Sequence, residues 1–105
     1  MNANTMRKKA AEVAELLKVL SHPKRLLILC HLVEQERAVG DLAVLVGVRE
    51  AAVSQQLILL RKDRLVGTRR EGRTVFYSLA RPDIKALIGF LYETYCAGGG
   101  RRPRG

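Results

Sequence analysis

Residues 38–79 read AVGDLAVLVGVREAAVSQQLILLRKDRLVGTRREGRTVFYSL and contain the patterns of two helices followed by a hairpin. Its first part has apolar residues at the i, i+3, i+4, i+7 spacing of an amphipathic helix: Val39, Leu42, Ala43 and Val46. Gly47 then supplies the left-handed backbone that a tight turn between two helices needs. The next helix has a core stripe at similar spacing: Val53, Leu57 and Leu60.

A β-hairpin is expected directly after these two helices. Its strands are 66–70 and 74–79, with Glu71 and Gly72 at the tip and a return strand that opens on the β-branched and aromatic run TVFY. Helix, turn, helix and basic hairpin in this order predict a winged helix-turn-helix. The fold class is therefore mostly α with a small β-hairpin wing, about five helices and two strands in all.

The second of these helices is expected to read DNA. Opposite its core stripe it carries small and amide-bearing side chains, which suit a helix that enters the major groove. Gln55 is the side chain type that pairs with adenine N6 and N7. Together with the start of the helix and the hairpin tip, the expected DNA contacts are Arg49, Glu50, Ala51, Ser54, Gln55, Lys62, Arg70 and Arg73.

Composition and charge agree with a polyanionic partner. The chain has 105 residues and a net charge of +9, with 19 Lys and Arg against 10 Asp and Glu. Six of the basic residues lie between Arg61 and Arg73. Such clustering favours nucleic acid, and phosphate contacts would make binding strongly dependent on salt. This length suits one domain, predicted for 1–96, followed by a flexible basic tail over 97–105.

The first and last helices are expected to join two copies of the chain. They have more apolar surface than a small winged core can cover, which favours a twofold dimer. The expected interface is Val13, Leu16, Leu17, Leu20, Ile84, Leu87, Ile88, Leu91 and Tyr95. In the second helix, Leu26, Leu29, Cys30 and Val33 are expected to share a face. With no apolar run of membrane-spanning length and no signal peptide, the expectation is a cytoplasmic protein without a membrane partner.

Several motifs together resemble the ArsR family of bacterial winged-helix repressors. They are LSHPKRL, VGDLA, VSQQLILLR, REGRTVFY and YxxYC, and the similarity runs from about Ala10 to Cys96. The sulfide- and redox-responsive branch, of the BigR, SqrR and HlyU type, is the most similar. The resemblance implies a homodimer joined mainly through its first and last helices. It further implies a repressor that binds an inverted-repeat DNA operator and leaves it when an inducer is sensed.

The resemblance also bears on the inducer. Metal-sensing relatives have Cys-x-Cys where this chain has Ala38-Val39-Gly40, or an Asp-x-His where it has Asp83-Ile84-Lys85. No metal site and no cofactor are therefore expected. In the sulfide-responsive branch, one cysteine lies in the second helix and another ends the last helix, and Cys30 and Cys96 occupy these positions. The implied signal is a reactive sulfur species that forms a persulfide and then a disulfide or polysulfide bridge.

Other interpretations stay open. Taken without the resemblance, Cys30 is equally well explained as a small core residue. A metal-responsive repressor and a non-sensing architectural winged-helix protein are the alternative functions, whereas an enzyme is not expected because no base lies near a nucleophile. The chain also departs from the family's pattern: Arg49-Glu50-Ala51 enters the DNA-reading helix without a capping hydroxyl. There Arg49 is expected on phosphate, Ala51 near a thymine methyl, and Glu50 on a cytosine N4 or at the helix N-terminus. At Gln56, often His in the family, little effect is expected.

Overall fold

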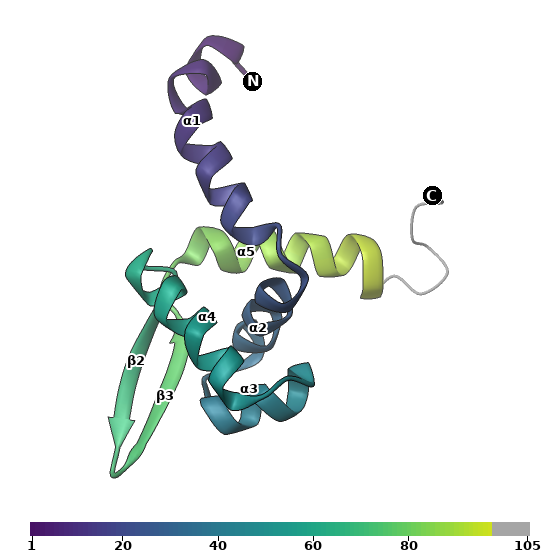
Figure 1. Cartoon of the computed structure of the whole chain (residues 1–105). Helices are drawn as coiled ribbons and strands as arrows, with labels where there is room; N and C mark the ends of the chain where they lie inside the picture. Colours follow the sequence, from purple (N-terminus) through teal and green to yellow (C-terminus); the bar gives the residue numbers. More distant parts are fainter. Residues whose placement is uncertain (98–105) are drawn as a thin grey trace.

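The computed structural model describes residues 1–97 and has the shape of a winged helix-turn-helix with a projecting first helix (Figure 1). The elements in chain order are α1 (Ala3–Leu20), α2 (Pro23–Glu34), β1 (Arg37–Ala38), α3 (Val39–Val46), α4 (Glu50–Lys62), β2 (Val66–Glu71), β3 (Thr74–Leu79), α5 (Pro82–Tyr92) and η1 (Glu93–Ala97). The π-helical turn η1 continues directly from α5. The predicted tail lies outside the described residues, apart from Ala97.

One apolar core holds α2, α3, α4, α5 and the start of β2 together. The predicted stripes of α3 and α4 are confirmed, since Leu42, Val53, Leu57 and Leu60 are all fully buried. The predicted face of α2 is only partly right. Ile28, Leu29 and Leu32 are the buried residues of this helix, whereas Leu26, Cys30 and Val33 pack against the core from its edge. The stripe is rotated because α2 contacts α3, β3 and α5 at once.

The sheet has three strands where two were expected. β2 and β3 form the predicted antiparallel hairpin, which extends to the pair Glu71 and Thr74 and turns at Gly72, whose φ is +64°. β1 adds a third strand by pairing Arg37 with Tyr77 and Ala38 with Phe76. Two residues are too few to show an alternating pattern, which is why this strand was not foreseen.

A C-terminal motif on α4 sets where the hairpin begins. The Arg64 N–H donates to the Arg61 carbonyl at 2.9 Å, and the Leu65 N–H donates to the Leu60 carbonyl at 2.9 Å. Arg64 has a φ of +63°, so it occupies the left-handed position that this motif usually gives to glycine. The turn delivers Leu65 and Val66 into the core, and the wing therefore starts from a fixed anchor.

The expected dimer interface needs a correction. Leu20, Ile84 and Ile88 are 7%, 0% and 2% exposed, because they fill the core of their own protomer. Among the remaining expected residues, Leu17 and Tyr95 are exposed and the others are half-buried: Val13, Leu16, Leu87 and Leu91. α1 projects from the body along most of its length (Figure 1), and Leu20 is its one buried residue. Three further exposed apolar side chains lie on α1 and α5 and were not expected in the interface: Met6, Phe90 and Tyr92.

Gln56 has a larger role than expected. The Arg25 Nε donates to the Gln56 Oε1 at 2.8 Å, and the Arg25 Nη1 donates to the Val19 carbonyl at 3.0 Å. The half-buried guanidinium therefore joins α4 to the last turn of α1 through α2. A hydrogen bond to a charged group contributes about 1.5–3 kcal/mol, so this contact is part of the scaffold.

Replacing Gln56 is accordingly expected to destabilise the fold. Gln56→Ala removes the acceptor of the Arg25 Nε, and we expect the midpoint of thermal unfolding to fall by several degrees, because about 1 kcal/mol corresponds to roughly 4–8 °C in a domain of this size. Gln55→Ala is the matched control, since Gln55 is exposed on the same helix. Calorimetry of the two variants checks this, and equal midpoints would contradict the role given to Gln56.

Candidate nucleic-acid interface and thiol pocket

One face of α4 packs against the core, which leaves the opposite, outer face of the helix exposed. α3 and α4 meet at a bend of 112°, with Gly47 in the left-handed conformation between them. Because Val53, Leu57 and Leu60 are buried, residues about 180° around the helix point away from the protein. Of the predicted contacts, Ala51, Gln55 and Lys62 are exposed there and Ser54 is half-exposed at the side.

At the N-terminus of α4, Arg49 and Glu50 differ in where their side chains lie. Arg49 is the N-cap residue and is exposed, but its side chain makes no capping hydrogen bond. The Glu50 carboxylate is turned toward α3, where a Cβ on Gly40 would lie 3.4 Å from the Glu50 Oε2. Gly40 belongs to the first turn of α3, and a helix N-terminus favours a negative charge. Glu50 is also the first residue of α4, so of its two expected roles this position favours the one at a helix N-terminus.

The hairpin carries two kinds of arginine. The Arg69 guanidinium is held by Glu36 from the segment before β1, with its Nε 3.2 Å from both carboxylate oxygens. It also lies over the Phe76 ring, 4.8 Å from the ring centre. The hydrogen bond from Arg69 holds the pKa of Glu36 below its usual value. Arg69 therefore fixes the wing, a pairing that sequence reasoning missed because the partners are distant in the chain.

Arg70 and Arg73 are the second kind. Both are exposed near the hairpin tip, and within residues 1–97 neither forms an ion pair. In Figure 1 the hairpin extends away from α1 and α5 at the end of the molecule where α3 and α4 lie. Two cations on a rigid hairpin beside an exposed helix face form a surface that suits a phosphate backbone.

The two cysteines line one apolar pocket. It has a volume of about 370 Å³ and lies between α2 and the end of the chain's last helix. The lining residues are Leu26, Leu27, Cys30, Ile88, Leu91, Tyr92, Tyr95 and Cys96. Cys30 is half-buried, Cys96 is exposed, and both are free thiols. The fold therefore brings together two thiols that are far apart in the sequence.

The two thiols differ in their surroundings. Burial raises the pKa of Cys30 above the ordinary thiol value, and the negative charges of Cys96 and Glu34 raise it further. At neutral pH, Cys30 is accordingly held as the neutral thiol, which is a poor nucleophile. Cys96 is the more accessible of the two sulfurs.

Alkylation by iodoacetamide is expected to show this difference. Because the folded protein raises the pKa of Cys30, the Cys30 thiolate forms only at higher pH. The alkylation rate of Cys30 should therefore keep rising beyond the pH at which the rate of an ordinary thiol, with a pKa of about 8.5, levels off. Mass spectrometry of the Cys30 peptide across a pH series measures the profile. The urea-unfolded protein is the control and should give the ordinary curve. Coincident curves for the folded and unfolded chains would contradict the assignment.

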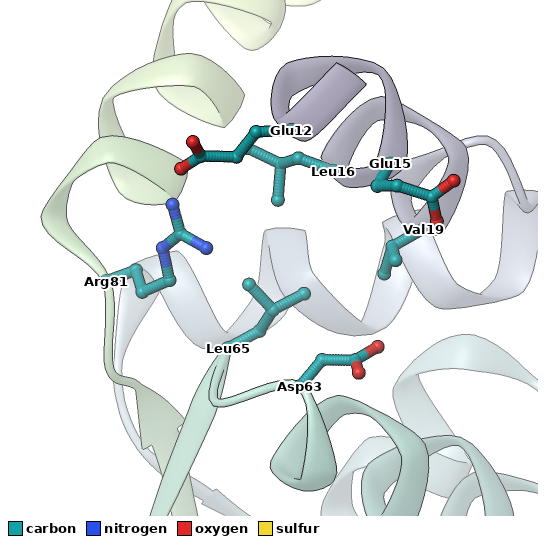
Figure 2. Close-up of a pocket in the computed structure, with 7 residues that line it drawn as sticks. All are labelled: Glu12, Glu15, Leu16, Val19, Asp63, Leu65 and Arg81. Atoms are coloured by element: carbon teal, nitrogen blue, oxygen red, sulfur yellow. The ribbon is translucent and has the colours of Figure 1, made fainter. Parts of the chain in front are cut away.

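A second pocket, of about 210 Å³, lies between α1, the turn after α4 and the start of α5 (Figure 2). Figure 2 shows the charged ends of Arg81 and Glu12 turned toward each other. Arg81 also donates to the two Asp83 oxygens at 3.0 and 2.5 Å. The hydrogen bond to Asp83 raises the pKa of Arg81, with a smaller contribution from Glu12. The Arg81–Asp83 ion pair lies within the start of α5, and Glu12 of α1 adds an electrostatic attraction to the same guanidinium.

Among residues 1–97, no three His, Cys, Asp or Glu side chains are grouped as a metal site requires. In the same range no single helix is long and apolar enough to span a membrane, and only the sharply bent pair α3 and α4 passes that test when joined.

Comparison with known proteins places the chain in a family. The family described as "Bacterial regulatory protein, arsR family" matches residues 22–68, which include α3 and α4. The chain is 43% identical over 96 residues to the transcriptional activator HlyU of Vibrio cholerae, covering 91% of this chain and 89% of that protein.

Solved structures agree with the sequence comparison. The crystal structure of the transcriptional repressor BigR from Xylella fastidiosa superposes with a TM-score of 0.86 at 44% identity, covering 92% of this chain and 99% of that one. A homodimeric winged helix-turn-helix domain, Mb0332 from Mycobacterium bovis, gives a TM-score of 0.70 at 32% identity, covering 82% and 81% of the two chains. The exposed α4, the anchored wing and these similarities together show that the protein belongs to the ArsR family of winged-helix, DNA-binding transcriptional regulators.

Proposed function

We propose that this regulator is a homodimeric repressor that leaves its operator when sulfane sulfur links Cys30 to Cys96. One observation carries the proposal: two free thiols from α2 and from the end of the last helix line the same apolar pocket. A bridge there would join two helices that pack against each other. We infer that the protein acts on chromosomal DNA and hence in the cytoplasm.

The DNA interface is the outer face of α4 with the hairpin tip. Gln55 is placed to bond base edges, whereas Arg49, Lys62, Arg70 and Arg73 are placed to neutralise phosphates. Ala51 and Ser54 keep this face slim enough for a major groove. Two copies related by a twofold axis would read two half-sites of an inverted repeat, one helical turn apart or a multiple of it.

The exposed apolar surfaces of α1 and of the last helix support a dimer. Leu17 and Met6 on α1 are exposed, as are Phe90 and Tyr95 at the other end of the chain. Pairing of α1 and α5 with the same helices of a second copy would cover them, and the structural neighbour from Mycobacterium bovis is described as homodimeric. Without Leu20, Ile84 and Ile88, which are buried in the protomer core, the proposed interface consists of the residues that this core leaves accessible: Val13, Leu16, Leu17, Leu87, Leu91 and Tyr95.

The chemistry begins at the more accessible thiol. The Cys96 thiolate attacks an inorganic polysulfide, which loses one sulfur atom to it, so that Cys96 becomes a persulfide and a polysulfide shorter by one sulfur leaves. The Cys30 thiolate then attacks the Cys96 Sγ and expels hydrosulfide, which gives a disulfide. If Cys96 carries two added sulfurs, attack on the inner one expels hydrosulfide and leaves a trisulfide. In both routes the two thiols are oxidised by two electrons, and sulfane sulfur is reduced to sulfide.

The contacts of α2 explain how a bridge at Cys30 would reach the DNA interface. The Arg37 guanidinium, just after α2, donates to Glu34 at 2.6 Å and to the His31 carbonyl at 3.1 Å. Beside it, Glu36 holds Arg69 of the wing. A shift of α2 relative to the last helix would therefore displace the wing and change the spacing of the two α4 helices. A coupling of about 1–3 kcal/mol corresponds to roughly 5- to 150-fold weaker operator binding.

The test is operator binding by the reduced, disulfide-treated and polysulfide-treated protein, with mass spectrometry of the Cys30 and Cys96 peptides. The operator is first selected from random duplexes with the reduced protein. We expect tight binding when reduced and release when both peptides are linked. Release by Zn²⁺ with both thiols unmodified would instead favour a metal-responsive repressor. Equal affinity for the selected operator and bulk DNA would favour an architectural protein.

A further inference from the structure

An exposed isoleucine lies in the middle of the DNA-reading face of α4. Ile58 is 64% exposed and belongs neither to the core nor to the side chains packed against it. At 100° per residue it falls in the same outward stripe as Gln55 and Lys62, three residues after the first and four before the second. The core stripe of α4 therefore does not explain it.

The surroundings of Ile58 identify what covers it. Its neighbours on this face are an amide and a cation, and the last turn of α4 is basic through Arg61 and Lys62. The dimer faces on α1 and α5 are on other elements. A surface of this charge suits DNA, and the 5-methyl group of thymine is the apolar group that a base pair presents in the major groove.

We propose that Ile58 reads the 5-methyl group of a thymine in each operator half-site. Ile58 lies about 4.5 Å along the helix axis from Gln55, which is close to one base-pair step of about 3.4 Å. The thymine is therefore expected in the base pair next to the one that Gln55 reads. The branched side chain of isoleucine is stiff, so it presents its methyl groups to the base with little loss of freedom.

This proposal rests on the DNA-reading role of α4 given above. It goes beyond that role because it adds a specificity residue that, unlike Gln55, discriminates thymine from cytosine by apolar contact alone. The side chain is a hydrocarbon and neither donates nor accepts a hydrogen bond. Removing only the 5-methyl group from the thymine should consequently remove the contribution of Ile58 to operator binding.

The experiment is a scan of the selected operator in which each thymine is replaced by deoxyuridine, which lacks only the 5-methyl group. For the wild type, we expect one thymine in each half-site at which the replacement weakens binding about fourfold, the effect of one buried methyl group. At that position, replacing thymine by deoxyuridine should not change the affinity of the Ile58→Ala protein for the operator. Val44→Ala is the matched control, because it shortens an apolar side chain that is 82% exposed on α3 rather than on α4 and should keep the fourfold effect.

The outcomes separate this proposal from the proposed function. If every uracil replacement affects the wild type and Ile58→Ala equally while both prefer the operator, the thymine contact is wrong and the repressor function stands. If the reduced wild type does not prefer the operator over bulk DNA, both are overturned. Unchanged thermal unfolding of Ile58→Ala, which alters an exposed side chain, confirms that the comparison is made between folded proteins.

Discussion

Polysulfide is expected to leave both the Cys30→Ser and the Cys96→Ser protein on the operator, whereas it weakens binding by the wild type roughly 5- to 150-fold. The reason is that a bridge needs two sulfur atoms, and each variant retains one. Fluorescence anisotropy with a labelled operator duplex, before and after polysulfide treatment, measures the effect. In the reduced state, both variants should bind the operator as tightly as the wild type, because neither thiol lies on the outer face of α4 or on the wing.

The two variants should differ in stability and in their products. Serine at half-buried Cys30 costs about 1–3 kcal/mol if its hydroxyl finds no partner, so Cys30→Ala serves as a second variant that keeps the site apolar. Cys96 is exposed, and its replacement should be nearly neutral. Mass spectrometry should find a persulfide on Cys96 in the Cys30→Ser protein. Much less modification is expected on Cys30 in the Cys96→Ser protein, because burial raises the pKa of Cys30.

One result would end the two-thiol mechanism. A folded Cys30→Ser or Cys30→Ala dimer that still leaves its operator on polysulfide treatment would show that modification of Cys96 alone is sufficient. The bridge would then be a by-product of sensing. Titration of the wild type with Zn²⁺ would be the next experiment, because it tests the metal-responsive alternative separately from sulfur sensing.

The elements that carry the DNA interface could be predicted from the sequence because their signals are local. The apolar period of α3 and α4, the turn at Gly47 and the strands of the hairpin each depend on residues within a few positions of one another. The same period fixes which side of α4 is free, and so it placed Ala51 and Gln55 correctly on the surface. These positions follow from helix geometry alone.

Pairs distant in the chain could not be predicted in this way. The contact of Arg25 with Gln56 and that of Glu36 with Arg69 join elements whose relative placement exists only in the folded chain. Likewise, the periodicity of α5 identified an apolar stripe but did not show what covers it. Ile84 and Ile88 were assigned to a partner subunit although they fill the core of their own protomer.

The thiol pair is a different case. No spacing rule relates Cys30 to Cys96, and their pairing was expected from the family resemblance alone. In the structure, α2 and the last helix pack together, and both cysteines line one pocket. Ile58 is missed for a different reason: the stripe of Val53 and Leu57 already turns it outward, but an isoleucine in a helix is usually assigned to a core.

Base reading and phosphate binding are expected to separate cleanly in the Gln55→Ala and Arg73→Ala proteins. Gln55→Ala should lose discrimination at one base position in each half-site, by roughly 5- to 150-fold, because a bidentate contact to a base contributes about 1–3 kcal/mol. Arg73→Ala should weaken binding to all duplexes about equally. It should also reduce the slope of log K against log salt by roughly one unit per protomer, because a protein with one phosphate contact fewer releases fewer counterions from the DNA on binding.

Competition binding to the operator, to single-base variants and to bulk DNA, repeated at several salt concentrations, measures both effects. Arg7→Ala is the matched control for Arg73→Ala. It removes the same charge from the projecting part of α1, at the far end of the molecule from the hairpin tip (Figure 1), and should leave the salt slope unchanged. Unaltered specificity in Gln55→Ala would show that the outer face of α4 does not lie in the groove. An equal loss of slope in Arg7→Ala and Arg73→Ala would show that net charge, rather than the wing, governs binding.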